Sequence, residues 1–73
     1  MFGISRETVE RIKKEYPVGC TVRLRRMDDI HAPAPGTLGK VYFVDDTATI
    51  HVRWENGSSL GVVYGEDACD RVN

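Results

Sequence analysis

Two sets of side chains in this 73-residue sequence could bind a partner, and they predict different partners. The first set has the aromatic, apolar and proline residues typical of peptide recognition, and consists of Trp54, Tyr42, Met27, Ile30, Pro33 and Pro35. The second set is basic or imidazole and could neutralise phosphates beside the Tyr42 ring, which would stack on a base; it consists of Lys40, His51, Arg53, Arg23 and Arg25. The first set predicts a protein or peptide partner, and the second a nucleic acid.

The sequence does not predict a catalytic site. Nucleophilic catalysis needs a nucleophile, a base and an orienting group that converge. No spacing in the sequence brings its nucleophiles beside its bases; these residues are Ser58, Ser59, Cys20, Cys69, His31 and His51. We therefore expect a protein without enzyme activity and without a cofactor.

Paired carboxylates could bind a hard cation at three places: Asp28-Asp29 with His31, Asp45-Asp46, and Glu66-Asp67. Their spacing matches no calcium loop and no zinc pattern. Aspartate is also an ordinary turn residue, because its carboxylate accepts hydrogen bonds from nearby backbone N–H groups. The interpretation we favour is therefore a turn role for each pair, with no metal ligands.

Composition and charge narrow the class of protein. Apolar residues make up 41% of the chain, enough for one small globular domain, and a core this thin leaves room for weak self-association. The formal net charge of −1 excludes a global attraction to nucleic acid. No apolar run approaches the roughly 18 residues of a membrane span, and the first residues lack the pattern of a signal peptide. We expect a cytoplasmic protein with no membrane partner, in which Cys20 and Cys69 are free thiols.

The first element predicted by the sequence is a helix over residues 6–16. Ser5 is a suitable N-cap, and Val9, Ile12 and Tyr16 fall on one apolar stripe at helical spacing. Pro17 and the glycine after it then end the helix.

Alternating apolar and polar residues predict about five short antiparallel strands, over residues 20–25, 38–44, 48–55, 58–64 and 69–72. Trp54 shares the inward parity of Ile50 and Val52, so it is a core-edge residue first and a ligand platform second. Between the first two strands, residues 26–36 form a long loop that Pro33 and Pro35 make stiff.

The turns between strands predict a register. A two-residue Asp45-Asp46 turn sets Val41 opposite Ile50 and Phe43 opposite Ala48, all inward, with a bulge near Tyr42. On the outer face, Lys40 then lies opposite His51, Leu38 opposite Arg53 and Tyr42 opposite Thr49. A three-residue loop over 55–57, with Gly57 left-handed, sets Val62 opposite Ile50.

One N-terminal helix followed by about five short strands predicts a mainly β fold, an SH3-like antiparallel barrel. An OB-like barrel is the alternative; it is disfavoured because that fold has longer strands and carries its helix between the third and fourth strands.

The sequence also resembles a known family over most of its length. The residues that carry the resemblance are Arg26-Met27-Asp28-Asp29, Ala32-Pro33-Ala34-Pro35-Gly36-Thr37 with Gly39, Val44-Asp45-Asp46, Ile50-His51-Val52, Trp54-Glu55-Asn56-Gly57-Ser58-Ser59-Leu60 and Gly65-Glu66-Asp67. They are similar to the short bacterial and phage or mobile-element proteins grouped as domain of unknown function 4314. The resemblance implies an SH3-like barrel and no assigned activity or site residues. Thr47-Ala48 departs from the family, which more often has a glycine in this turn.

The leading hypothesis is a non-catalytic interaction module that binds a protein or peptide partner through the first set of residues. The alternative is an accessory nucleic-acid-binding protein of a phage or mobile element, which uses the second set on the outer sheet face. Salt separates the two, because binding to phosphates weakens steeply with ionic strength.

Overall fold

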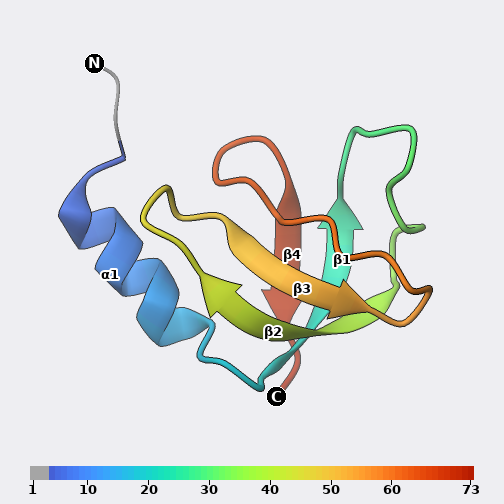
Figure 1. The fold of residues 1–73 in the computed structure, drawn as a ribbon, viewed down its shortest axis with the longest axis horizontal. Helices are drawn as coiled ribbons and strands as arrows, with labels where there is room; N and C mark the ends of the chain where they lie inside the picture. The colour runs from blue at the N-terminus through green and yellow to red at the C-terminus, as the bar shows by residue number, and fades with distance from the viewer. Residues whose placement is uncertain (1–3) are drawn as a thin grey trace.

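The computed structural model describes residues 4–73. Its elements are one helix, α1 (Arg6–Glu15), and four strands, β1 (Thr21–Arg26), β2 (Leu38–Val44), β3 (Ile50–Trp54) and β4 (Ala68–Arg71) (Figure 1). The strands form one antiparallel sheet in the order β3-β2-β1-β4. The predicted mainly β fold with an N-terminal helix is therefore confirmed.

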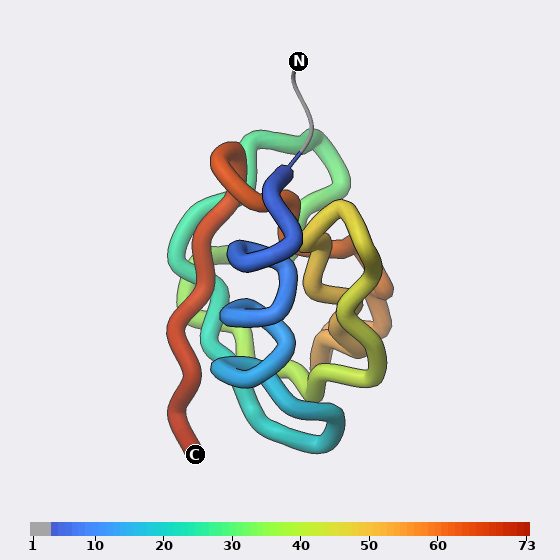
Figure 2. Tube along the Cα trace, turned by 90° about the vertical axis from the view of Figure 1, so that its left-hand side faces the viewer, coloured from blue at the N-terminus to red at the C-terminus, as the bar shows by residue number. Residues whose placement is uncertain are grey.

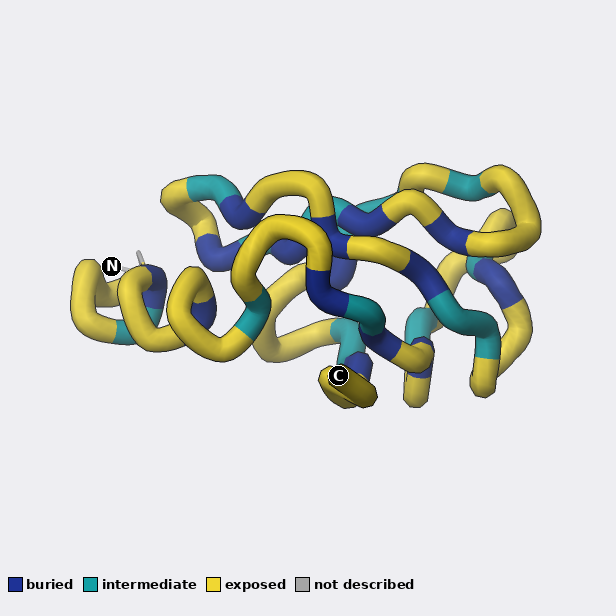
Figure 3. The backbone as a smooth tube through the Cα atoms, turned by 90° about the horizontal axis from the view of Figure 1, so that it is seen from below, coloured by how far each residue is buried: buried dark blue, intermediate teal, exposed yellow. Residues whose placement is uncertain are grey.

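Residues next to its two ends cap the helix. The Ser5 hydroxyl oxygen accepts a hydrogen bond from the backbone N–H of Thr8 at 3.1 Å, as expected of an N-cap. Helical geometry ends at Glu15, one residue before the predicted end, and Tyr16 is the C-cap. Val9 and Ile12 are the buried residues of α1, and in Figure 3 the buried positions of α1 lie on the side turned toward the sheet.

The helix lies between the two edges of the sheet. In Figure 2, α1 runs between β4 on one side and the β2–β3 connection on the other. On the β4 side, the Tyr16 hydroxyl donates a hydrogen bond to the Cys69 carbonyl at 3.4 Å. On the other side, the Lys13 ammonium lies 3.1 Å from an Asp46 carboxylate oxygen. The helix thus adds its apolar stripe to the core and is held at both edges of the sheet.

The core is formed by the inward face of the sheet and the stripe of α1. Buried and exposed positions alternate along the strands (Figure 3), so each strand contributes one apolar face. The buried hydrophobic residues are Val9, Ile12, Cys20, Val22, Leu24, Val41, Val44, Ala48, Ile50, Val52, Trp54, Val62 and Cys69.

The predicted register of the β2–β3 hairpin was wrong by two residues. Val41 lies opposite Val52, rather than opposite Ile50, and Lys40 lies opposite Arg53. A bulge between Val41 and Phe43 was predicted and is present. It reverses the alternation of β2 after Tyr42, so Phe43 points outward and the next residue, Val44, is buried.

The connection between β2 and β3 is longer than the two residues predicted, because Val44 pairs with Ile50. Two of its residues are held by the Asp45 side chain, whose Oδ1 accepts bonds from the N–H groups of Thr47 and Thr49 at 2.9 and 3.0 Å. Ala48 takes a left-handed conformation, with φ of 61°, at a roughly 1–2 kcal/mol cost for a residue other than glycine. The Asp45 bonds offset that cost.

The predicted strand over residues 58–64 is present only as a single bridge, in which Val62 pairs with Ile50 as expected. In this segment, side chains form hydrogen bonds with the backbone C=O and N–H groups of Leu60, which in a strand would pair with a neighbouring strand. The Trp54 indole N–H donates to the Leu60 carbonyl at 2.9 Å, and the Ser58 hydroxyl accepts from the Leu60 N–H at 3.2 Å. Gly57, with φ of 92°, supplies the left-handed residue predicted for the preceding turn.

The last strand, β4, pairs with β1 as predicted, with Leu24 opposite Cys69 and Val22 opposite Arg71. Both cysteines are free and buried, in agreement with the sequence. Within residues 4–73, no helix is long and apolar enough to cross a membrane.

Candidate binding surfaces

The outer side of the β2–β3 hairpin gathers rings and cations into one surface, here called the hairpin face: Lys40, Tyr42, Phe43, His51 and Arg53. The Arg53 guanidinium carbon lies 4.6 Å from the centre of the Tyr42 ring, a cation–π contact. The rings of Tyr42 and Phe43 each contact the His51 ring, with centroid distances of 6.0 and 5.7 Å. Lys40, His51 and Arg53 belong to the predicted nucleic-acid set and Tyr42 is the ring predicted beside them, and the structure brings the four together through a different register.

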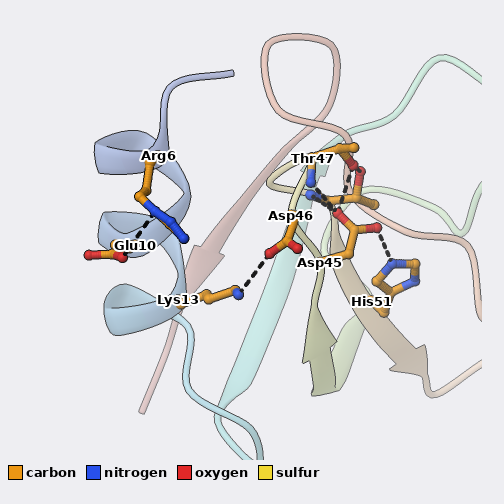
Figure 4. Close-up of polar contacts among 8 residues, drawn as sticks. Arg6, Glu10, Lys13, Asp45, Asp46, Thr47 and His51 are labelled. Atoms are coloured by element: carbon orange, nitrogen blue, oxygen red, sulfur yellow. Dashed lines mark hydrogen bonds and ion pairs between the residues drawn. The ribbon is translucent and has the colours of Figure 1, made fainter. Parts of the chain in front are cut away.

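His51 is fixed on this face by Asp45. Its Nε2 lies 2.8 Å from Asp45 Oδ2, while Asp45 Oδ1 accepts from the hydroxyl of Thr47 at 2.6 Å and from the two backbone N–H groups of the turn (Figure 4). Partial burial alone would raise the pKa of Asp45, but these bonds from Thr47, His51 and Thr49 outweigh it and hold the pKa well below its usual range. The carboxylate is thus a structural anion that orients the imidazole.

Replacing Asp45 by asparagine is expected to destabilise the protein by about 2 kcal/mol at neutral pH, because hydrogen bonds to a charged acceptor are lost. A lowered pKa in the folded state gives stability that is present above the ordinary aspartate value, about 3.9, and is lost as the pH falls below it. The difference between wild type and Asp45→Asn should therefore shrink in that acid range. Urea unfolding across pH measures it.

Asp46→Asn is the matched control, because Asp46 lies in the same turn with a side chain 94% exposed, and among residues 4–73 its side chain forms an ion pair with Lys13 alone. It should change the free energy of unfolding by less than about 1 kcal/mol at any pH. Equal acid sensitivity of wild type and Asp45→Asn would contradict the assignment.

A second surface is an open groove between the loop after β1 and the segment after Leu60. Its lining, here called the groove, consists of Met27, Asp28, Asp29, Thr49, His51, Leu60, Gly61, Val63, Glu66 and Asp67. Met27, Leu60 and Val63 supply apolar surface. Gly61 leaves room between the walls, since a Cβ there would lie 2.7 Å from Thr49 Cγ2.

Four carboxylates line the groove, and within residues 4–73 none of them forms an ion pair. Asp29 accepts from the His31 N–H at 2.7 Å and Asp67 from the Val63 N–H at 2.9 Å, which are the turn roles predicted for them. Asp28 and Glu66 are exposed. The groove therefore combines apolar walls with negative charge. Across the described chain, no group of three or more His, Cys, Asp or Glu side chains is placed to hold a metal ion.

Some of the residues predicted to contact a peptide are buried and others are exposed. Trp54 is 3% exposed and Pro33 is also buried, so neither offers a surface to a partner. Met27 packs against the core and lines the groove. Ile30 is 93% exposed and Pro35 is exposed, both in the loop that joins β1 to β2.

The two β1 arginines of the nucleic-acid set differ in their surroundings. The Arg25 guanidinium donates to both carboxylate oxygens of Asp70, at 3.1 and 3.2 Å, so its charge is already compensated. Arg23 is exposed, lies opposite Leu38 on β2 and Asp70 on β4, and has no ion pair within residues 4–73. Arg23, rather than Arg25, can extend the hairpin face.

The thiols are inert packing residues. Burial, together with the nearby Asp70 and Cys20, raises the pKa of the Cys69 thiol to about 12. Burial likewise raises the pKa of Cys20. The reactive thiolate form is therefore suppressed at both positions.

Sequence reasoning missed Phe43 as a surface residue, since it was placed inward opposite Ala48. The signal was available: a bulge near Tyr42 shifts every later residue of the strand to the other face. The groove carried no such signal, because residues 26–29 and 60–67 meet only through the tertiary fold.

The fold and these surfaces define a small, mainly β protein with two candidate binding faces. The chain belongs to the family described as Domain of unknown function (DUF4314), whose model matches residues 5–72, nearly the whole chain. This confirms the resemblance found in the sequence. No curated protein and no solved structure matches the chain.

Proposed function

We propose that this protein is a non-catalytic interaction module, built as a small SH3-like barrel, and that it binds an extended basic peptide segment of a protein partner in the groove. Two observations support the barrel. The helix α1 lies between the two edges of the sheet, and Val62 pairs with Ile50 at the edge of β3 that faces away from β2. The observation that carries the function is the groove itself, where apolar walls lie beside four carboxylates that form no ion pair within residues 4–73.

The chemistry of the groove favours one kind of partner. A lysine or arginine side chain has an apolar stem that can lie along Met27 and Leu60, and a charged head that can reach Asp28 or Glu66. Neighbouring apolar side chains of the same peptide would pack on Val63. Ile30 gives the adjoining loop an apolar contact, because an isoleucine 93% exposed gains by being covered.

The test is selection from a displayed peptide library on the immobilised protein, followed by calorimetry with the best peptides. We expect peptides that carry Lys or Arg next to an apolar residue. The double variant Asp28→Asn with Glu66→Gln should bind them roughly two- to thirtyfold more weakly, because each of the two exposed charge pairs contributes about 0.2–1 kcal/mol. Ile30→Ser should also weaken binding without changing the free energy of unfolding.

The matched control is Glu7→Gln with Glu10→Gln, which removes the same charge from exposed positions of α1. It should leave the affinity unchanged. Selected peptides without basic residues, or equal binding by the groove and helix variants, would refute the proposed site.

A further inference from the structure

The hairpin face carries two cations in an arrangement that costs stability in the free protein. Lys40 and Arg53 are directly opposite each other on neighbouring strands, and both are exposed. Like charges directly opposite are destabilising in a sheet. Within residues 4–73 neither forms an ion pair, whereas Arg25, on the same sheet, is bonded to Asp70. An anion placed between Lys40 and Arg53 would relieve this repulsion.

A third cation continues the row. Lys40 is paired with Thr21, and Arg23 lies two residues further along β1, opposite Leu38 on β2 and opposite Asp70 on β4, whose carboxylate is bonded to Arg25. Diagonal neighbours in an antiparallel pair are roughly 7–8 Å apart, within reach of long side chains. Arg53, Lys40 and Arg23 therefore form a line of positive charge across three strands.

Rings lie beside this line. The bulge leaves two consecutive aromatic residues at the surface, with Tyr42 38% and Phe43 53% exposed. The Tyr42 ring is held by Arg53 on one side and contacts His51, which Asp45 fixes in turn. These rings are thus held in place before any ligand binds, which lowers the ordering cost of stacking.

We propose that the hairpin face binds single-stranded nucleic acid, with Lys40, Arg53 and Arg23 on the phosphates and with Tyr42 and Phe43 stacked on bases. Both halves of the surface are then used, as in proteins that bind single strands by combining a cationic track with aromatic platforms. A duplex would leave the rings without exposed bases to stack on. A phosphopeptide would use the cations and leave the rings without flat partners.

This site is separate from the groove proposed to bind peptides, with which it shares only His51. The protein would then join a nucleic-acid strand to a protein partner through two different faces.

The test is fluorescence anisotropy with labelled single strands of DNA and of RNA, about 12 nucleotides long, and with the corresponding duplex. We expect binding of either single strand at low salt, weaker binding of the duplex, and loss of affinity as salt rises. The variant Lys40→Ala with Arg53→Ala should lower the slope of log affinity against log salt by about 1.4, since each phosphate contact contributes about 0.7. Tyr42→Ala or Phe43→Ala should each weaken binding roughly 5- to 150-fold.

Matched controls change the same chemistry elsewhere. Arg6→Ala with Lys14→Ala removes two exposed cations from α1, and Tyr64→Ala removes a 43% exposed ring near Arg11. Both should bind the single strand like wild type, and so should Asp28→Asn with Glu66→Gln, which tests the groove alone. Circular dichroism confirms that each variant is folded.

Three results would overturn the proposal. They are no single-strand binding at low salt, equal binding by the hairpin-face and helix variants, and binding of a phosphotyrosine peptide in place of the oligonucleotides with the same variants defective. The last result would assign the face to a phosphopeptide.

Discussion

Replacing Trp54 by alanine is expected to leave the protein largely unfolded at room temperature. Trp54 is 3% exposed in the core, and removing a buried tryptophan costs about 3–5 kcal/mol. A single domain of this size has about that much stability in total. The indole also donates its N–H to the Leu60 carbonyl, which holds the segment that forms one wall of the groove. Circular dichroism and urea unfolding measure the loss.

Two variants separate packing from partner contact. Trp54→Phe keeps most of the apolar volume and loses the hydrogen bond, so it should be folded and destabilised by about 1–2 kcal/mol. Phe43→Ala removes a ring of similar size that is 53% exposed, and should cost about 1 kcal/mol or less. A folded Trp54→Ala protein with lost partner binding would contradict the core assignment and restore Trp54 as a ligand platform.

The sequence predicts well those parts of the fold that depend on the alternation of apolar and polar residues within a single strand. The limits of β2 were predicted as observed, and Ile50, Val52 and Trp54 point inward as their parity requires. The strand predicted over 48–55 is shorter, Ile50–Trp54, because Ala48 lies in the turn with a left-handed backbone. The pairing of β4 with β1 was also predicted, because a short terminal strand closes most easily beside the first.

Register depends on turn chemistry, and here the prediction was wrong. The side chain of Asp45 accepts hydrogen bonds from the backbone N–H groups of Thr47 and Thr49, two and four residues further on. These bonds build a turn that is longer than the predicted two residues. Because of the longer turn and the bulge, Lys40 lies opposite Arg53 rather than opposite His51 as predicted. All the residues of the hairpin face except Phe43 were predicted from the sequence, and their contacts were not.

The groove could not be read from the sequence at all. Its carboxylates are ordinary turn residues when taken one at a time, as Asp29 and Asp67 show by accepting backbone bonds. Only the approach of the Met27 loop to the segment after Leu60 places them together. About 30 residues separate these two segments in the sequence, whereas strand alternation and turn motifs relate only residues close together in the chain.

Replacing Gly39 by alanine is expected to cost about 3 kcal/mol, the second large effect in this protein, because the β2–β3 spacing depends on the absence of a side chain there. A Cβ at Gly39 would lie 2.5 Å from Val52 Cγ1, 2.8 Å from Trp54 Cε3 and 2.9 Å from the Arg53 carbonyl oxygen. The last of these atoms is backbone, so the strands themselves must separate. Urea unfolding of the purified variant gives the change in free energy.

Gly61→Ala is the matched comparison, since its Cβ would lie 2.7 Å from Thr49 Cγ2 but 3.5 Å from the backbone oxygen of Ile50. Turning the Thr49 side chain relieves that contact, so the cost should be nearer to about 1 kcal/mol. Combining Gly39→Ala with Val52→Ala should destabilise by less than the sum of the two changes, because the shorter side chain removes one of the three clashes. Additive costs, or a Gly39→Ala protein as stable as wild type, would show that β2 and β3 are not packed in this register, and the alignment of Lys40 with Arg53 on the hairpin face would fail with it.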